Sequence, residues 1–155
     1  MKPVSISEIK KDLETRQSNE LLGYCLRLAR FKKENKELLA FLLFESDNLS
    51  DYTENVKQQI EQQFEEMNKS NIYFIKKSVR KILRMINKHI RFSLPKQSEA
   101  ELIIHFCNCM RRYSIPLKKS RQLMNLYESQ LKKIDAALST LHPDLQYDLK
   151  KQLLA

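Results

Sequence analysis

The sequence predicts an all-α protein, a compact array of about eight antiparallel helices. The chain of 155 residues contains one glycine and four prolines. Tight turns between strands commonly need positive φ, which glycine adopts at least steric cost, so a chain whose only glycine is Gly23 is poorly suited to hairpins. Apolar residues recur at intervals of three and four, the period of a helix face. The length is typical of one domain, and we expect a single helical domain over residues 1–155.

Start signals are clear, because Ser and Asn residues precede several periodic segments and can cap the free N–H groups of a first helical turn. Ser5 with Glu8 and Ser98 with Glu101 have the spacing of a capping box. The expected helices are residues 6–16, 19–31, 34–45, 51–68, 72–92, 99–112, 117–141 and 144–154. The connections between them are short, so successive helices are expected to run antiparallel.

The hydrophobic pattern separates these helices by burial. Residues 38–44 read LLAFLLF, so we expect helix 34–45 to be central, and helix 99–112, with apolar residues on two faces, to be enclosed as well. Helix 51–68 carries a narrow apolar stripe that is typical of an outer layer. The stripe consists of Tyr52, Val56, Ile60 and Phe64.

Helix 117–141 carries apolar residues at alternating spacings of three and four, which is the seam of a helix packed along a partner. The seam consists of Met124, Tyr127, Leu131, Ile134, Leu138 and Leu141. The run is shorter than a sustained coiled coil, so we favour packing within the chain; a homo-oligomer through helix 117–141 is the alternative, and it requires the seam to be exposed in the monomer.

A short internal similarity suggests a second form for the array. Glu20-Leu21-Leu22 followed by LLFES is similar to Glu101-Leu102-Ile103 followed by NLYES, at an offset of about 80 residues. Two helix pairs of about 40 residues would span that offset, which is the period of HEAT-type α-solenoids. The alternatives are therefore a helical bundle and a short HEAT-like α-solenoid.

The positive charge is concentrated in one segment. The chain has 28 Lys and Arg against 19 Asp and Glu, and residues 67–98 contain nine basic residues and no acid. These nine are Lys69, Lys76, Lys77, Arg80, Lys81, Arg84, Lys88, Arg91 and Lys96. The rest of the chain is formally neutral, so the net charge of +9 lies in this segment.

The expected helix 72–92 carries most of these cations on one side. At about 100° per residue they fall within a narrow arc opposite an apolar side formed by Ile75, Val79 and Ile82, among others. The predicted binding residues are Lys77, Arg80, Lys81, Arg84, Lys88 and Arg91. Such a row of cations attracts polyanions, and neutralised phosphates release counterions.

A structural role for this charge is the main competing interpretation. An acidic run with only Lys57 inside it precedes the basic helix, so the two could partly neutralise each other across a hairpin as a solvated surface. The acids are Glu45, Asp47, Asp51, Glu54, Glu61, Glu65 and Glu66. The sequence contains no zinc-finger spacing, RNP motif or GXXG loop that would indicate a known nucleic-acid-binding module. Nucleic-acid binding by the basic helix would need support from a second basic stretch. That stretch contains Arg111, Arg112, Lys118, Lys119 and Arg121.

Catalytic and metal motifs are not found. Cys107 and Cys109 diverge by about 200° on a helix, and although Glu101, His105 and Cys109 share one flank, we expect no metal site and no cofactor. P-loop, G-x-S-x-G and H-E-x-x-H motifs do not occur. The three cysteines are expected to be free thiols, with Cys25 on an apolar face as a small buried hydrophobe.

The expected function is therefore that of a non-catalytic binding or adaptor protein rather than an enzyme. The basic helix 72–92 would recognise an acidic protein surface, with nucleic acid as the alternative partner and an oligomeric structural protein as a third candidate. No signal peptide or apolar run of transmembrane length is present, so the expected location is cytoplasmic.

Overall fold

The computed structural model describes residues 1–92 and 94–154. Over these residues the chain contains eight α-helices, two short turns of other helix types and no strand, which confirms the all-α prediction. The contacts divide the chain into two compact units, Met1–Ser46 and Asp47–Ala155. The single domain expected over residues 1–155 stays a prediction.

The first unit contains three short α-helices. They are α1 (Ile6–Glu14), α2 (Ser18–Phe31) and α3 (Lys33–Ala40), and α3 continues into a π-helical turn, η1 (Phe41–Glu45). The capping box expected at α1 is confirmed: Ser5 Oγ accepts a hydrogen bond from the Glu8 amide, and the Glu8 side chain accepts one from the Ser5 amide. In the π-helical turn the Ser46 amide donates to the Phe41 carbonyl five residues earlier.

The expectation that helix 34–45 is buried all round is wrong for most of its apolar residues. Leu42, Leu43 and Phe44 are 53%, 62% and 79% exposed. Within this unit α3 packs against α2, and Phe41 is the one buried residue of the apolar run 38–44. Cys25 of α2 is also exposed, against expectation. The apolar run predicts a helix here, but it does not show which neighbouring elements would bury that helix.

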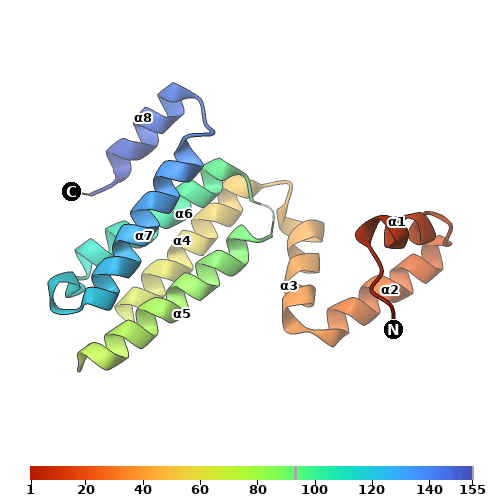
Figure 1. The fold of residues 1–155 in the computed structure, drawn as a ribbon, viewed down its shortest axis with the longest axis horizontal. Helices are drawn as coiled ribbons and strands as arrows, with labels where there is room; N and C mark the ends of the chain where they lie inside the picture. The colour runs from red at the N-terminus through yellow and green to blue at the C-terminus, as the bar shows by residue number, and fades with distance from the viewer. Residues whose placement is uncertain (93, 155) are drawn as a thin grey trace. The chain divides into compact units, whose positions relative to one another are not determined.

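The second unit is a bundle with a central helix (Figure 1). Its elements are α4 (Leu49–Glu65), α5 (Ile72–Ile90), α6 (Lys96–Arg112), a 3₁₀ turn η2 (Leu117–Lys119), α7 (Arg121–Leu138) and α8 (Pro143–Gln152). The helices α4, α5, α6 and α7 run side by side, and α6 packs against each of the others as well as against α8. Of the two expected forms, this unit therefore takes the bundle.

The core of the second unit follows the predicted stripes. The α4 stripe of Tyr52, Val56, Ile60 and Phe64 is buried, and α6 is enclosed as expected, with Leu102 and Phe106 fully buried. In α7 the seam residues Tyr127, Ile134 and Leu138 are buried within the chain, and α7 packs along α6. The oligomeric alternative required this seam to be exposed, and these three positions are not.

Two helix starts differ from the prediction. Ser98 lies inside α6, where it is buried, so the expected Ser98–Glu101 capping box is wrong; the helix begins after Pro95. The sequence predicts one helix over residues 117–141, but Ser120 has extended backbone angles and its side chain caps α7 by accepting a hydrogen bond from the Leu123 amide. The helix therefore starts at Arg121, and residues 117–119 form the separate turn η2.

Candidate functional site

The helix α5 separates an apolar side from a basic side, as its sequence predicts. Asn71 caps its first turn by accepting a hydrogen bond from the Phe74 amide, and no acid lies in that turn. Ile75, Val79, Ile82 and Ile86 are buried against the bundle. This burial fixes the rotation of the helix and therefore directs the opposite side to solvent.

The six predicted binding residues lie on that outer side. Lys77, Arg80, Lys81, Arg84 and Arg91 are exposed, and Lys88 is half-buried. We call these six residues the α5 basic face. Their placement agrees with the sequence analysis, whereas their role in binding stays a prediction.

Two acids of α4, Glu54 and Glu61, form ion pairs with residues outside the α5 basic face. Glu61 pairs with Arg112 of α6, and Lys57 lies between Glu54 and Glu101. Over the described ranges 1–92 and 94–154, no ion pair joins an acid to Lys77, Arg80, Lys81, Arg84 or Arg91. The main competing interpretation is that the preceding acidic helix neutralises the basic one. Within the described part of the chain, no direct ion pair at these five side chains supports it.

A groove of about 470 Å³ lies at the amino-terminal half of the α5 basic face. Its lining consists of Tyr73, Lys76, Lys77, Arg80, Arg84 and Gln122. Gln122, near the start of α7, accepts hydrogen bonds at Oε1 from Lys76 Nζ (3.0 Å) and from Arg80 Nη2 (3.4 Å). Two cations thus converge on one neutral oxygen, and the lining contains four cations and no acid.

Sequence reasoning missed two members of this groove. Lys76 belongs to the basic segment but not to the predicted site, because it lies about 100° around the helix from Lys77. That offset turns Lys76 toward α7, where Gln122 meets it. Gln122 is separated from Lys76 by 46 positions, so no local pattern could have indicated the pairing.

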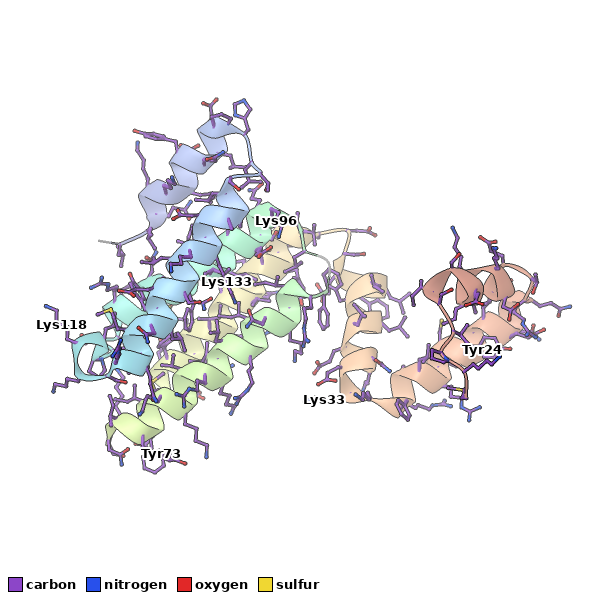
Figure 2. The ribbon with its side chains drawn as sticks, in the orientation of Figure 1. Tyr24, Lys33, Tyr73, Lys96, Lys118 and Lys133 are labelled. Carbon is purple, nitrogen blue, oxygen red and sulfur yellow. The ribbon has the colours of Figure 1, made fainter. Side chains whose placement is uncertain are left out.

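The fold places part of the second basic stretch beside the groove. Because Gln122 contacts α5, the start of α7 with Arg121 lies next to the groove. Tyr73 and Lys118 both project from the end of this unit where α5 and α7 begin (Figure 2). The other two arginines are engaged inside the unit: Arg111 donates to the Tyr127 hydroxyl (3.2 Å), and Arg112 holds the Glu61 carboxylate.

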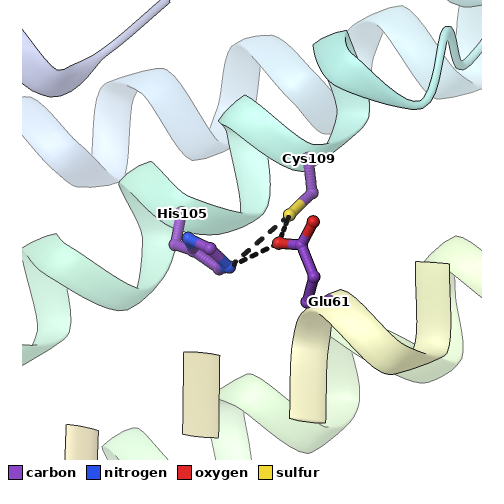
Figure 3. A group of neighbouring side chains, drawn as sticks. All are labelled: Glu61, His105 and Cys109. Carbon is purple, nitrogen blue, oxygen red and sulfur yellow. Dashed lines mark hydrogen bonds and ion pairs between the residues drawn. The ribbon is translucent and has the colours of Figure 1, made fainter. Parts of the chain in front are cut away.

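A second cluster of polar side chains joins α4 to α6 (Figure 3). His105 Nε2 lies 3.1 Å from Glu61 Oε2, Cys109 Sγ lies 3.3 Å from the same oxygen, and Cys109 Sγ lies 3.6 Å from His105 Nε2. We call Glu61, His105 and Cys109 the α4–α6 cluster. The sequence aligned His105 and Cys109 correctly but named Glu101 as the third residue, whereas Glu101 pairs with Lys57.

Two further side chains hold the outer edge of this cluster. Arg112 donates to both Glu61 oxygens, at 3.0 Å and 2.8 Å, and Tyr113 Oη donates to Glu61 Oε1 at 2.8 Å. Burial opposes ionisation of Glu61, but the hydrogen bonds from Tyr113 and Arg112 outweigh it and hold the pKa of this carboxyl below its usual value. Burial lowers the pKa of His105 and raises the pKa of the Cys109 thiol to about 12.

The cluster does not have the geometry of a nucleophilic triad. In such a triad the base contacts the nucleophile through one ring nitrogen and the orienting carboxylate through the other. Here Glu61 and Cys109 both approach Nε2 of His105. The thiol is fully buried and its pKa is raised, which disfavours the reactive thiolate.

No family model, curated protein or solved structure matches this chain. Among the described residues, no helix combines the length and the apolar character that crossing a membrane would require. Function is therefore inferred from the chemistry of the α5 basic face and of the α4–α6 cluster.

Proposed function

We propose that this chain is a non-catalytic binding protein that recognises an acidic partner surface through the α5 basic face. The observation that carries the proposal is the groove beside Gln122, where Lys76, Lys77, Arg80 and Arg84 gather without an acid in the lining. Cations in a shared concave surface reinforce one another's potential and attract an anionic group more strongly than isolated surface lysines do.

The hydrogen bonds to Gln122 support this assignment. Lys76 and Arg80 are held near each other although their charges repel, and the neutral Oε1 between them offers only partial compensation. A carboxylate entering the groove would supply the full negative charge that Gln122 lacks. A carboxylate would add charge–charge attraction to the hydrogen bonds that these two cations can donate.

Nucleic acid is a second candidate, favoured by one specific observation. The contact of Gln122 with α5 brings the start of α7, including Arg121, next to the groove, so the basic surface extends beyond a single helix. A phosphate backbone could follow such an extended surface, and Tyr73, which is 63% exposed beside the groove, offers a ring for base stacking.

The test is a fluorescence anisotropy titration with labelled oligoglutamate and with single- and double-stranded DNA and RNA, at about 50 and about 200 mM salt. The proposal predicts that oligoglutamate binds at low salt and that the Lys77→Ala/Arg80→Ala/Arg84→Ala variant loses this binding. A matched control removes three exposed lysines from other helices, as Lys132→Ala/Lys133→Ala/Lys150→Ala, and is expected to bind like the wild type.

The outcomes separate the candidates. Nucleic acid would be favoured if DNA or RNA binds tightly while oligoglutamate stays unbound. The logarithm of the association constant should then fall linearly with the logarithm of the salt concentration, and the slope should be reduced by about 3 in the triple variant. If every probe fails to bind at low salt, or if the two triple variants bind equally well, the α5 basic face is an ordinary solvated surface.

A further inference from the structure

We infer that Glu61, His105 and Cys109 form a binding site for a divalent transition-metal ion, with Zn²⁺ as the ion that suits this donor set best. The inference concerns the α4–α6 cluster and does not depend on the α5 basic face. One carboxylate oxygen, one imidazole nitrogen and one sulfur, each from a different residue type, lie within 4.8 Å of one another.

The three donor atoms converge on one point rather than forming a chain. Each of the two side chains from α6 approaches the same oxygen of Glu61, and they also approach each other (Figure 3). A hydrogen-bond relay would use both nitrogens of His105, whereas an ion needs three donors around a common centre. The arrangement therefore suits coordination better than proton transfer.

The donor separations match one face of a tetrahedron. Bonds of about 2.0–2.3 Å from Zn²⁺ to oxygen, nitrogen and sulfur place neighbouring ligand atoms about 3.3–3.6 Å apart. The observed separations are 3.1 Å, 3.3 Å and 3.6 Å. Small shifts of the Glu61 carboxylate would complete the face without moving either helix.

Helix geometry explains why these residues meet. His105 and Cys109 are four positions apart on α6, so their side chains lie one turn apart on the same face. Glu61 comes from α4, which packs against that face of α6. The burial of Ile60 and Phe64 on either side of Glu61 in the sequence fixes the rotation of α4 and so the direction of the carboxylate.

The outer hydrogen bonds orient the carboxylate for this role. Tyr113 Oη and Arg112 Nη1 hold Oε1 of Glu61, which leaves Oε2 directed at His105 and Cys109. Such outer partners commonly fix the orientation of metal ligands. Arg112 Nη2 also contacts Oε2 (2.8 Å) and Cys109 Sγ (3.3 Å), so it must move aside when the ion enters.

Charge and exposure are compatible with an ion held by three protein ligands. Binding releases the thiol proton of Cys109 to solvent, and His105 coordinates through the lone pair of Nε2, so its ring proton resides on Nδ1. The side chains of His105 and Glu61 are 22% and 27% exposed, whereas Cys109 is fully buried. The site therefore lies at the rim of the core, where a water molecule can complete the tetrahedron.

The experiment measures Zn²⁺ binding to the full chain by competition with a chelating dye, in a Cys25→Ser background that removes the exposed thiol. We expect one Zn²⁺ per chain. Cys109→Ser and His105→Gln should each weaken binding by more than about 100-fold, and Tyr113→Phe, which removes an outer hydrogen bond, by about 10-fold. Cys107→Ser is the matched control, because Cys107 is buried on the same helix but does not belong to the cluster.

A second measurement keeps the test decisive if a ligand variant fails to fold. In the Cys25→Ser/Cys107→Ser double variant, Cys109 is the one cysteine that remains of the three in the sequence. Added Co²⁺ should then give a near-ultraviolet thiolate-to-cobalt charge-transfer band, which no carboxylate or imidazole produces. Absence of this band, absence of Zn²⁺ binding at tens of micromolar, or equal loss in Cys109→Ser and Cys107→Ser would each overturn the inference.

Discussion

Gln122 is the residue on which the proposed binding surface most depends. Its Oε1 accepts hydrogen bonds from Lys76 and Arg80 and thereby fixes two cations in the groove without cancelling their charge. A carboxylate at this position would form ion pairs with both. The identity of one neutral side chain thus decides whether the groove is available to an acidic partner.

Replacing Gln122 with Glu should weaken binding of an acidic partner to the groove. The carboxylate of the Gln122→Glu variant would pair with Lys76 and Arg80, so the affinity for an acidic probe should fall about 10-fold while the far-ultraviolet circular dichroism stays unchanged. Gln152→Glu, which makes the same charge change at the exposed end of α8, is the control. Equal affinities of the two variants would show that the groove does not take part in binding.

The three cysteines should react at very different rates. Cys25 is exposed, whereas Cys107 and Cys109 are buried and their thiol pKa values are raised to about 12, chiefly by that burial. At neutral pH the thiolate fraction of the buried pair is therefore very small. Titration with a chromogenic disulfide should give one fast-reacting thiol per chain, which is lost in Cys25→Ser, and two thiols that react only in denaturant. Three fast-reacting thiols would contradict the burial of α6.

At the scale of single elements, the end of α6 shows how a helix terminus positions the basic turn that follows. The Ile115 amide donates to the Met110 carbonyl and the Ser114 amide to the Arg111 carbonyl, which is the Schellman pattern. Ser114, with φ of 53°, occupies the left-handed position that glycine usually takes. This turn directs the chain into η2, which carries Lys118 and Lys119.

Substituting Ser114 with Gly should therefore stabilise the protein. A non-glycine residue in the left-handed region costs about 1 kcal/mol, so Ser114→Gly is expected to raise the free energy of unfolding by about that amount. Chemical denaturation followed by circular dichroism measures the change. Ser129→Gly, at an exposed position inside α7, is the opposite control and should lower stability by a similar amount; if both variants destabilise the chain, the left-handed turn carries no strain.

Element types were predictable from local pattern, but contacts between elements were not. The stripe of α4 and the two sides of α5 follow from spacing alone, because helix geometry turns a sequence interval into an angle. The exposure of Leu42 and Phe44 did not follow, since the burial of an apolar residue depends on neighbouring elements that local sequence does not specify. Glu61 lies 44 positions from His105 in the sequence, so local spacing could not predict their contact and indicated Glu101 instead.

The two units of the protein differ in how much core they contain. Residues of the second unit supply the buried faces of α4, α5, α6 and α7, including Ile60, Phe106 and Ile134. In the first unit Phe41 is the one buried side chain among residues 1–46, all of which the structure describes. The formal charge excess also lies in the second unit, on residues 67–98.

The second unit should fold without the first. A fragment of residues 47–155 is expected to unfold in one cooperative transition, because its core is built from its own helices, whereas a fragment of residues 1–46 should show little helix in isolation. Thermal unfolding followed by circular dichroism measures both. A fragment 47–155 without a cooperative transition would mean that the first unit is required to complete that core.

Locating a bound acidic probe on the protein tests most directly whether the α5 basic face is the binding surface. A ¹⁵N-labelled full chain titrated with oligoglutamate at low salt should show chemical-shift changes concentrated in α5 between Tyr73 and Arg84 and at the side-chain amide of Gln122. Changes confined to α8 or to residues 1–46, or none at saturating probe, would contradict the assignment of the α5 basic face as the binding surface.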